Sequence, residues 1–318
     1  MMTFGERFQG RCESAVYPVC LGLDPRVDEM PAAIRDSAVA ASTGRDDAIR
    51  RCIARYHEVA ISAVADLVPA VKLQLAFYEQ YGIPGMTALL DTIAAARRAG
   101  LLVIADGKRN DIASTAKAYA DAFLGCPSAL GEARPAFDAD ALTVNPYLGW
   151  DSLVPFAEAA REHGKGLFVL VHTSNPSSVE IQEAAPGDDP IYLRVARQVS
   201  ALGDEFFDGQ HLSSVGAIVG CTFPEAAGIA RRAMPRSPIV VVGYGAQEGT
   251  LPGCVACFDE RGTGAVVNAS RSLTYGADMA LGSEEDVVTA IRSRTEQLGR
   301  GIATALTAAA PSRQPTVG

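Results

Sequence analysis

Residues 101–123 read LLVIADGKRNDIASTAKAYADAF, and the order of residue types in this stretch decides how the rest of the chain is interpreted. An unbroken apolar run at 101–105 is followed by a charged turn and then by an Ala-rich segment with helical periodicity. Apolar runs without strict alternation are typical of parallel strands buried on both faces. The stretch therefore predicts a strand, a polar loop and a helix, in that order.

The same order recurs along the chain. The candidate strands are residues 17–23, 68–73, 101–105, 139–144, 167–171, 214–220, 239–242 and 264–267. The helix candidates include residues 86–99, 112–124, 153–162, 224–233 and 285–308. Repeated strand–helix units of this number predict an α/β fold, a single-domain TIM (β/α)8 barrel.

Two connections are longer than a minimal barrel needs. Residues 25–67 are expected to contain extra helical turns, and residues 175–213 a loop plus a helix. The final residues, AAPSRQPTVG, are typical of a frayed end. We therefore expect a barrel domain at residues 1–308 and a disordered C-terminal tail at residues 309–318.

Composition and charge argue against several classes of function. The formal net charge is −9 and no block of basic residues occurs, so nucleic-acid binding is not expected. The N-terminal residues lack the apolar core of a secretory signal, and no apolar run is long enough for a membrane span. Only Cys254 and Cys257 form a CxxC pair, and no second pair or His cluster completes a zinc site. We expect a cytoplasmic protein with reduced, structural thiols and no metal.

Charged residues collect at the predicted strand ends, where a TIM barrel carries its active site. Asp106 and Lys108 are two residues apart after the third strand, so both can point toward the barrel mouth. Asn110 or Asp111 can cap the next helix. Lys72 lies within the apolar run of the second strand, although only four of the 28 basic residues are lysines.

Two interpretations of these charges are open. They can form a surface ion pair with an ordinary helix cap, and Lys72 can extend its charged end to solvent. Alternatively, an aspartate keeps a neighbouring lysine protonated, as a proton donor needs. Lys72 would then extend an alternating set of charges that suits an anionic substrate passing through a carbanion. The dense clustering favours the second interpretation.

Other strand ends offer hydrogen-bonding groups. Asp24 follows the first strand, although Asp-Pro also commonly opens a turn. The fourth and fifth strands lead into Asn145, Thr173, Ser174 and Asn175, which suit a polar heterocycle but are equally ordinary loop residues.

The loops after the seventh and eighth strands predict a phosphate site, because this pair of loops commonly holds phosphate in barrels. Gly243 and Gly245 permit close backbone approach, and Gln247 can donate a side-chain N–H. Arg271 offers a bidentate fork for phosphate oxygens.

Together these residues resemble the orotidine 5′-phosphate decarboxylase family, and more closely its longer bacterial subfamily (type 2). The family hallmark Asp-x-Lys-x-x-Asp occurs as DGKRND at residues 106–111, with Lys72 upstream. GLDPR, KLQLAFYEQYG, TVNPYLG, TSNP, GYGAQEG and NASRS are also similar to that subfamily, in collinear order over roughly residues 17–276. The chain departs at Asn110 and Ala113, where the subfamily usually carries glycine.

The resemblance implies a cofactor-free lyase that converts orotidine 5′-monophosphate to UMP and CO2 in de novo pyrimidine biosynthesis. It implies that Lys108 protonates C6 of the pyrimidine, while Asp106 faces the substrate carboxylate and maintains the charge of the lysine. Lys72 and Asp24 would contact ribose hydroxyls, and Ser174 would bind the pyrimidine edge.

Further roles follow from the same resemblance. Gln247 and Arg271 would hold the phosphate, helped by the backbone at Gly243 and Ser270. In a homodimer, Asp111 and Thr115 would reach into the neighbouring subunit's site.

Three alternatives remain at this point. A related barrel that acts on sugar phosphates would use a divalent metal on acidic strand-end residues. A Schiff-base aldolase would use Lys72 or Lys108 as a neutral amine, and flanking aspartates disfavour this. A non-catalytic phosphate-binding barrel would have no use for a complete set of alternating charges.

Overall fold

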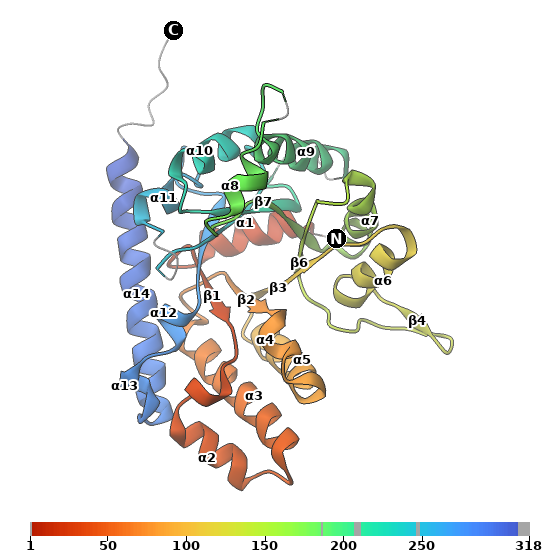
Figure 1. Ribbon diagram of the computed structural model, residues 1–318. Helices are drawn as coiled ribbons and strands as arrows, with labels where there is room; N and C mark the ends of the chain where they lie inside the picture. Colours follow the sequence, from red (N-terminus) through yellow and green to blue (C-terminus); the bar gives the residue numbers. More distant parts are fainter. Residues whose placement is uncertain (1, 186, 207–210, 246–248, 311–318) are drawn as a thin grey trace.

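Eight parallel strands close into a barrel in the computed structural model, which describes residues 2–185, 187–206, 211–245 and 249–310 (Figure 1). Around the barrel the strands follow the order β1-β10-β9-β8-β7-β6-β3-β2. They are β1 (Val19–Leu23), β2 (Ala70–Gln74), β3 (Leu102–Arg109), β6 (Ala141–Val144), β7 (Gly166–His172), β8 (Val215–Gly220), β9 (Ile239–Val242) and β10 (Ala265–Ala269). The predicted strands are all present, and the predicted TIM barrel is confirmed.

Side chains alternate between the barrel interior and the surrounding helices, as the period of a strand requires. Below the carboxyl ends of the strands, the barrel interior is filled by one buried apolar cluster, which includes Cys20, Ala70, Leu102, Ile104, Ala141, Phe168, Ile218, Val240 and Val266. The intervening strand residues join a larger core beneath the helices. Continued toward the carboxyl ends of the strands, the same alternation brings Lys72, Asp106 and Thr143 into the interior. These three polar side chains therefore lie directly above the apolar cluster that fills the barrel.

Helices cover the outside of the barrel (Figure 1). The predicted helices are present, with slightly different ends, as α5 (Gly82–Arg98), α6 (Ala113–Phe123), α7 (Val154–His163), α10 (Pro224–Ala233) and α14 (Glu284–Ala309). Shorter helical segments are α4 (Leu75–Glu79), α11 (Leu251–Val255), α12 (Arg271–Thr274), α13 (Ala277–Ala280), η1 (Val27–Glu29) and η2 (Trp150–Ser152).

The two long connections contain the helices expected there. Residues 25–67 form η1, α2 (Ala32–Ala40) and α3 (Arg45–Val64), while residues 175–213 contain α8 (Ser178–Gln182) and α9 (Ile191–Phe206). Because α14 continues through Ala309, the helix reaches the first residue of the predicted tail. Residues 311–318 lie outside the described residues.

The sequence did not predict α1 (Phe4–Ser14) or the hairpin of β4 (Ser128–Ala129) with β5 (Glu132–Ala133), and it also did not predict several of the shorter helical segments. α1 closes the amino-terminal end of the barrel, where the rings of Phe4 and Phe8 lie 5.9 and 6.1 Å from the ring of Phe168. Gly166 makes this approach possible, since a Cβ there would lie 2.2 Å from the Phe4 ring.

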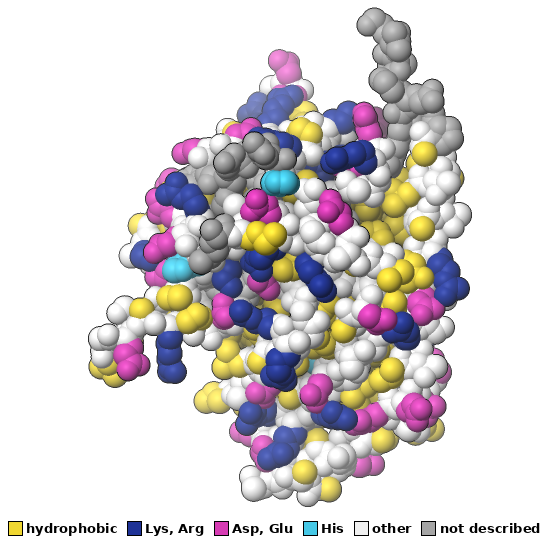
Figure 2. Space-filling view, turned by 180° about the vertical axis from the view of Figure 1, so that it is seen from behind, with side chains coloured by type: hydrophobic (Ala, Val, Ile, Leu, Met, Phe, Trp, Pro, Cys, Tyr) yellow, Lys and Arg dark blue, Asp and Glu magenta, His cyan; other side chains and the backbone are white. Residues whose placement is uncertain are grey.

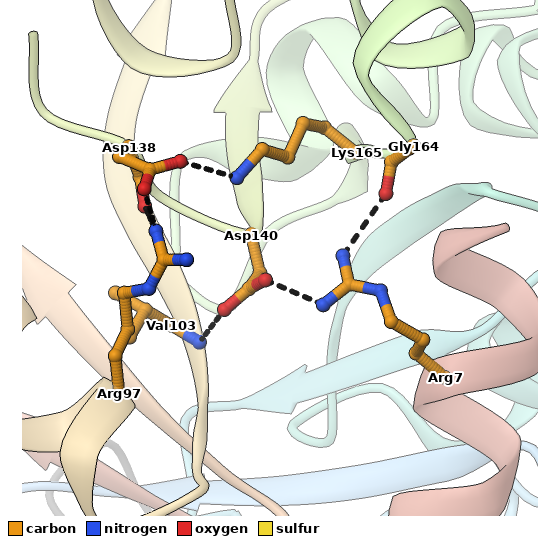
Figure 3. A network of polar contacts seen from close by, with 7 residues as sticks. All are labelled: Arg7, Arg97, Val103, Asp138, Asp140, Gly164 and Lys165. Carbon is orange, nitrogen blue, oxygen red and sulfur yellow. Dashed lines mark hydrogen bonds and ion pairs between the residues drawn. The ribbon is translucent and has the colours of Figure 1, made fainter. Parts of the chain in front are cut away.

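A polar network fastens α1 to the amino-terminal ends of the strands (Figure 3). Asp140 accepts hydrogen bonds from Arg7 Nη1 (2.6 Å) and from the Val103 N–H (3.0 Å). Arg7 also donates to the Gly164 carbonyl (2.9 Å). Asp138 completes the network by pairing with Arg97 and Lys165. Because this end lies opposite the catalytic face of a TIM barrel, the network serves stability.

The surface shows no large region of a single charge on the face drawn in Figure 2, where acidic and basic side chains are intermixed. Among the described residues, no helix has both the length and the apolar character needed to cross a membrane.

Candidate active site

Asp106 is the centre of the polar layer at the barrel mouth. Its Oδ2 accepts hydrogen bonds from Lys72 Nζ (2.7 Å) and Gln74 Nε2 (2.9 Å). Its Oδ1 accepts from Lys108 Nζ (2.7 Å) and Thr143 Oγ1 (2.8 Å). These donors come from β2, β3 and β6, which are adjacent strands of the barrel. The predicted contact of Asp106 with both lysines is present.

The three charges differ in exposure. The side chains of Lys72 and Asp106 are 4% and 5% exposed, whereas that of Lys108 is 41% exposed. Lys72 and Asp106 thus form the buried part of the cluster, and Lys108 carries positive charge to the open mouth. This arrangement makes Lys108 the cation available to a molecule in the mouth.

Electrostatic pairing keeps the buried groups charged. Burial alone would raise the pKa of Asp106, but Lys72 and Lys108 together hold that pKa well below its usual range. Burial likewise disfavours the charged form of Lys72, yet Asp106 and Asp24 raise the pKa of this lysine above its ordinary value. A carboxylate with an ammonium group on either side is therefore the stable state of the site.

Gln74 and Thr143 were missed by the sequence interpretation. Thr143 is fully buried, and its hydroxyl donates to Asp106 while accepting the Lys108 backbone N–H (2.8 Å). Lys108 has a positive φ of 47°, an uncommon conformation for a residue with a side chain. Thr143 therefore fixes both the carboxylate and the unusual backbone of the neighbouring lysine.

Asp24 follows β1 at the same end of the barrel. One of its carboxylate oxygens, Oδ1, is buried and has no hydrogen-bond partner, while the Asp24 carbonyl accepts from the Tyr275 hydroxyl (3.1 Å). A buried oxygen without a donor is costly, so this atom is suited to a hydroxyl group supplied by a ligand.

Asp111 and Thr115 do not join the Asp106 cluster within the chain. Thr115 is exposed, and Asp111 Oδ1 accepts only the N–H of the next residue, Ile112 (2.8 Å), among the bonds described. The prediction that Asn110 or Asp111 caps α6 is wrong, because Ile112 occupies the cap position without a side-chain bond. The loop reaches α6 through Ala113, whose positive φ places the helix start after both polar residues.

The two departures from the subfamily pattern have different local surroundings. Ala113 has a φ of 46°, in the left-handed region that favours glycine. Asn110 has no such conformation, but its side-chain Oδ1 is buried without a hydrogen-bond partner.

The residues that were predicted to contact a phosphate follow the strands on the opposite side of the barrel mouth. Gly243 and Gly245 have positive φ angles of 93° and 76°. Ser270 occupies the N-cap position of α12 without a side-chain cap bond. It lies so close to Gly22 that a Cβ added to Gly22 would be 1.8 Å from the Ser270 hydroxyl oxygen. Arg271 is the first residue of α12 and is exposed. Gln247 lies outside the described residues.

Metal-binding groups are not gathered in this site. Within the part of the chain that the structure describes, no three His, Cys, Asp or Glu side chains are grouped so that they could hold a metal ion. Cys254 and Cys257 are both buried as free thiols.

The fold and the site together define a (β/α)8-barrel enzyme with its chemistry at the carboxyl ends of the strands. The orotidine 5′-phosphate decarboxylase / HUMPS family model matches residues 18–280, and the chain belongs to this family.

Relatives support this membership over most of the chain. The orotidine 5′-phosphate decarboxylase of Rhodopirellula baltica is 45% identical over 275 residues, which cover 86% of this chain and 89% of the relative. That of Deinococcus radiodurans is 38% identical over 292 residues, covering 91% and 96%. The structure of Leishmania donovani OMP decarboxylase aligns with a TM-score of 0.73 at 28% identity, covering 96% of this chain and 100% of that chain.

Proposed function

We infer that the protein catalyses the decarboxylation of orotidine 5′-monophosphate to UMP and CO2, a step of de novo pyrimidine biosynthesis. The inference combines family membership with one observation, the Lys72–Asp106–Lys108 chain of alternating charges at the barrel mouth. A substrate that loses CO2 leaves an electron pair on a ring carbon, and fixed positive charge beside that carbon stabilises it.

Lys108 is the proton donor in this proposal. The bond between C6 and the carboxylate breaks, CO2 leaves, and the electron pair stays on C6. The Lys108 ammonium then gives a proton to C6 and becomes an amine, which regains a proton from water. Asp106 supports the step because it pairs with the ammonium and lies where it would face the substrate carboxylate.

Lys72 and Asp24 are proposed to bind ribose hydroxyls. Asp24 Oδ1 lacks a donor in the structure, which a hydroxyl would supply, and Lys72 has two further N–H groups beside its bond to Asp106. Lys72 lies on β2 and Asp24 directly follows the neighbouring strand β1, at the same end of the barrel.

The rest of the substrate is proposed to lie on the opposite rim. Ser174 would bind the pyrimidine edge, while Arg271, with Gln247 and the backbone at Gly243 and Ser270, would hold the phosphate. The positive φ of Gly243 and the exposed position of Arg271 at the start of α12 support this assignment.

A homodimer is the proposed working form, with Asp111 and Thr115 contributed to the partner's site. The support is that Thr115 is exposed and Asp111 partly exposed, and that the Asp111 carboxylate accepts only the N–H of the next residue among the bonds described, so that neither side chain joins the Asp106 cluster of its own subunit. A Lys108→Ala subunit paired with an Asp111→Ala subunit would contain one intact site, so mixing the two inactive variants should restore activity. If mixing restores none, Asp111 acts within its own subunit.

The reduced state of all seven cysteines in the structure suits the cytoplasmic location that we propose.

A metal-dependent sugar-phosphate barrel is the main competing function. Both oxygens of Asp106 are already occupied by ammonium, amide or hydroxyl donors, which is a poor arrangement for a metal ligand. The deciding experiment adds purified, chelator-treated protein to orotidine 5′-monophosphate and follows its absorbance. We expect loss of the substrate absorbance; no change would refute the proposed function.

A further inference from the structure

A side chain of α8 holds the loop that follows β7 by hydrogen bonds. Gln182, the last residue of α8, makes two hydrogen bonds to Thr173: its Oε1 accepts the Thr173 N–H (2.8 Å), and its Nε2 donates to the Thr173 hydroxyl (2.8 Å). The Thr173 hydroxyl in turn donates to Asn175 Oδ1 (2.7 Å). An amide that both accepts and donates defines the orientation of its partner, so the residues on either side of Ser174 are held in one arrangement.

The end of β8 limits the position of Ser174 from the other side. Gly220 lies so close that a Cβ there would be 2.9 Å from both the backbone nitrogen and the Cα of Ser174. The Thr222 hydroxyl donates to the Ser174 carbonyl (3.4 Å). Ser174 is therefore held between the carboxyl ends of β7 and β8, at the mouth of the barrel.

His172 anchors the start of the same loop. The pairing of β7 with β8 shifts register between Leu170 and His172, and this irregularity directs the His172 ring toward the helices. There the buried ring contacts Tyr192 and Phe223, each with centroids 5.0 Å away, and its Nε2 lies 3.3 Å from Glu183 Oε1. Glu183 immediately follows α8, so two successive residues, Gln182 and Glu183, hold two successive residues of the loop.

We propose that Gln182 is a positioning residue for pyrimidine recognition, acting through Thr173 to set where the Ser174 side chain lies. The His172–Glu183 contact fixes the base of the same loop. This inference rests on the proposed function, because it requires Ser174 to bind the pyrimidine edge. Its particular consequence is that loss of Gln182 weakens recognition of the base while the phosphate contacts across the barrel stay intact.

The test compares Gln182→Ala with Ile181→Ala, a control at a neighbouring residue of the same helix that is 56% exposed. Steady-state decarboxylation is measured together with inhibition by UMP and by ribose 5-phosphate, which lacks a base. Two lost hydrogen bonds correspond to roughly a 10- to 30-fold decrease in kcat/KM and a similar rise in the UMP inhibition constant. Ribose 5-phosphate inhibition should change less than about twofold, and Ile181→Ala should match the parent protein.

A second comparison separates positioning from a general structural effect. In a Ser174→Ala background, Gln182→Ala should cause little further loss, because the group that Gln182 positions is already absent. Equal weakening of UMP and ribose 5-phosphate, a full additional loss in the Ser174→Ala background, or unchanged kinetics for Gln182→Ala would each overturn the inference. Absence of turnover in the parent protein would instead refute the proposed function itself.

Discussion

Replacement of Thr143 by valine tests whether the hydrogen bonds around Asp106 position the reacting lysine. Valine has nearly the same shape, so packing in this fully buried position is retained while the hydroxyl is lost. Asp106 loses one donor, and the Lys108 N–H loses its acceptor. A bond to a charged acceptor contributes about 1.5–3 kcal/mol, and the part-buried bond from the Lys108 N–H contributes about 0.5–1.5 kcal/mol.

The free energy of unfolding should therefore fall by about 2–4 kcal/mol, allowing for partial relaxation and solvent access at the mouth. The backbone of Lys108 would also lose the contact that holds its positive φ. Because small displacements of a reacting group are costly, kcat should fall roughly 10- to 100-fold, with a smaller change in KM.

The assay combines urea unfolding with steady-state decarboxylation of orotidine 5′-monophosphate. Thr295→Val is a matched control, since Thr295 is equally buried but its hydroxyl donates only to the Ile291 carbonyl within α14. The control should lose some stability and keep its kcat. A Thr143→Val protein with the parent kcat would refute the positioning role of this hydroxyl.

Three further predictions concern other parts of the chain. Arg271→Ala should mainly raise KM, because a phosphate contact remote from C6 contributes to binding; an unchanged KM would contradict the proposed phosphate site. Ala113→Gly should raise the free energy of unfolding by about 0.5–1 kcal/mol by relieving the φ of 46°, and a decrease in urea-melt stability would count against strain there. Burial lowers the pKa of His57 to about 3. As the pH drops below about 6.5, the imidazole of the unfolded chain therefore binds a proton, whereas that of the folded protein stays neutral. Stability should therefore fall by up to about 1.4 kcal/mol per unit as the pH drops from 6.5 toward 3, and His57→Gln should flatten this dependence in thermal melts; an unchanged slope would exclude His57 as its source.

The barrel could be predicted because its strands are buried on both faces and appear in the sequence as unbroken apolar runs. The same periodicity placed Asp106 and Lys108 together, since residues two apart on a strand face the same side. Lys72 could be included because a lysine inside an apolar run needs an anionic partner, and Asp106 provides it.

Contacts between strands could not be derived from local patterns. Gln74 and Thr143 are ordinary polar residues in the sequence, and only the register of β2 and β6 against β3 brings them to Asp106. The helix cap was wrongly placed because the positive φ of Ala113 begins α6 one residue after Ile112.

The helix α1, by contrast, carried a usable local signal that was overlooked. Thr3 and Glu6 form a capping box, in which the Thr3 side chain accepts from the Glu6 N–H and the Glu6 carboxylate accepts from the Thr3 N–H. Phe4 and Phe8 follow with helical spacing. Their destination beneath Phe168 depends on the closed barrel and is not visible in the sequence.

The most direct test of the account is the turnover of Lys108→Ala on orotidine 5′-monophosphate, measured together with its affinity for UMP. Lys108 is the exposed end of the charge chain, and its side chain is the proposed source of the proton that C6 receives. We predict that the variant binds UMP and remains folded but loses nearly all turnover. A folded Lys108→Ala protein with near-normal turnover would contradict the central claim.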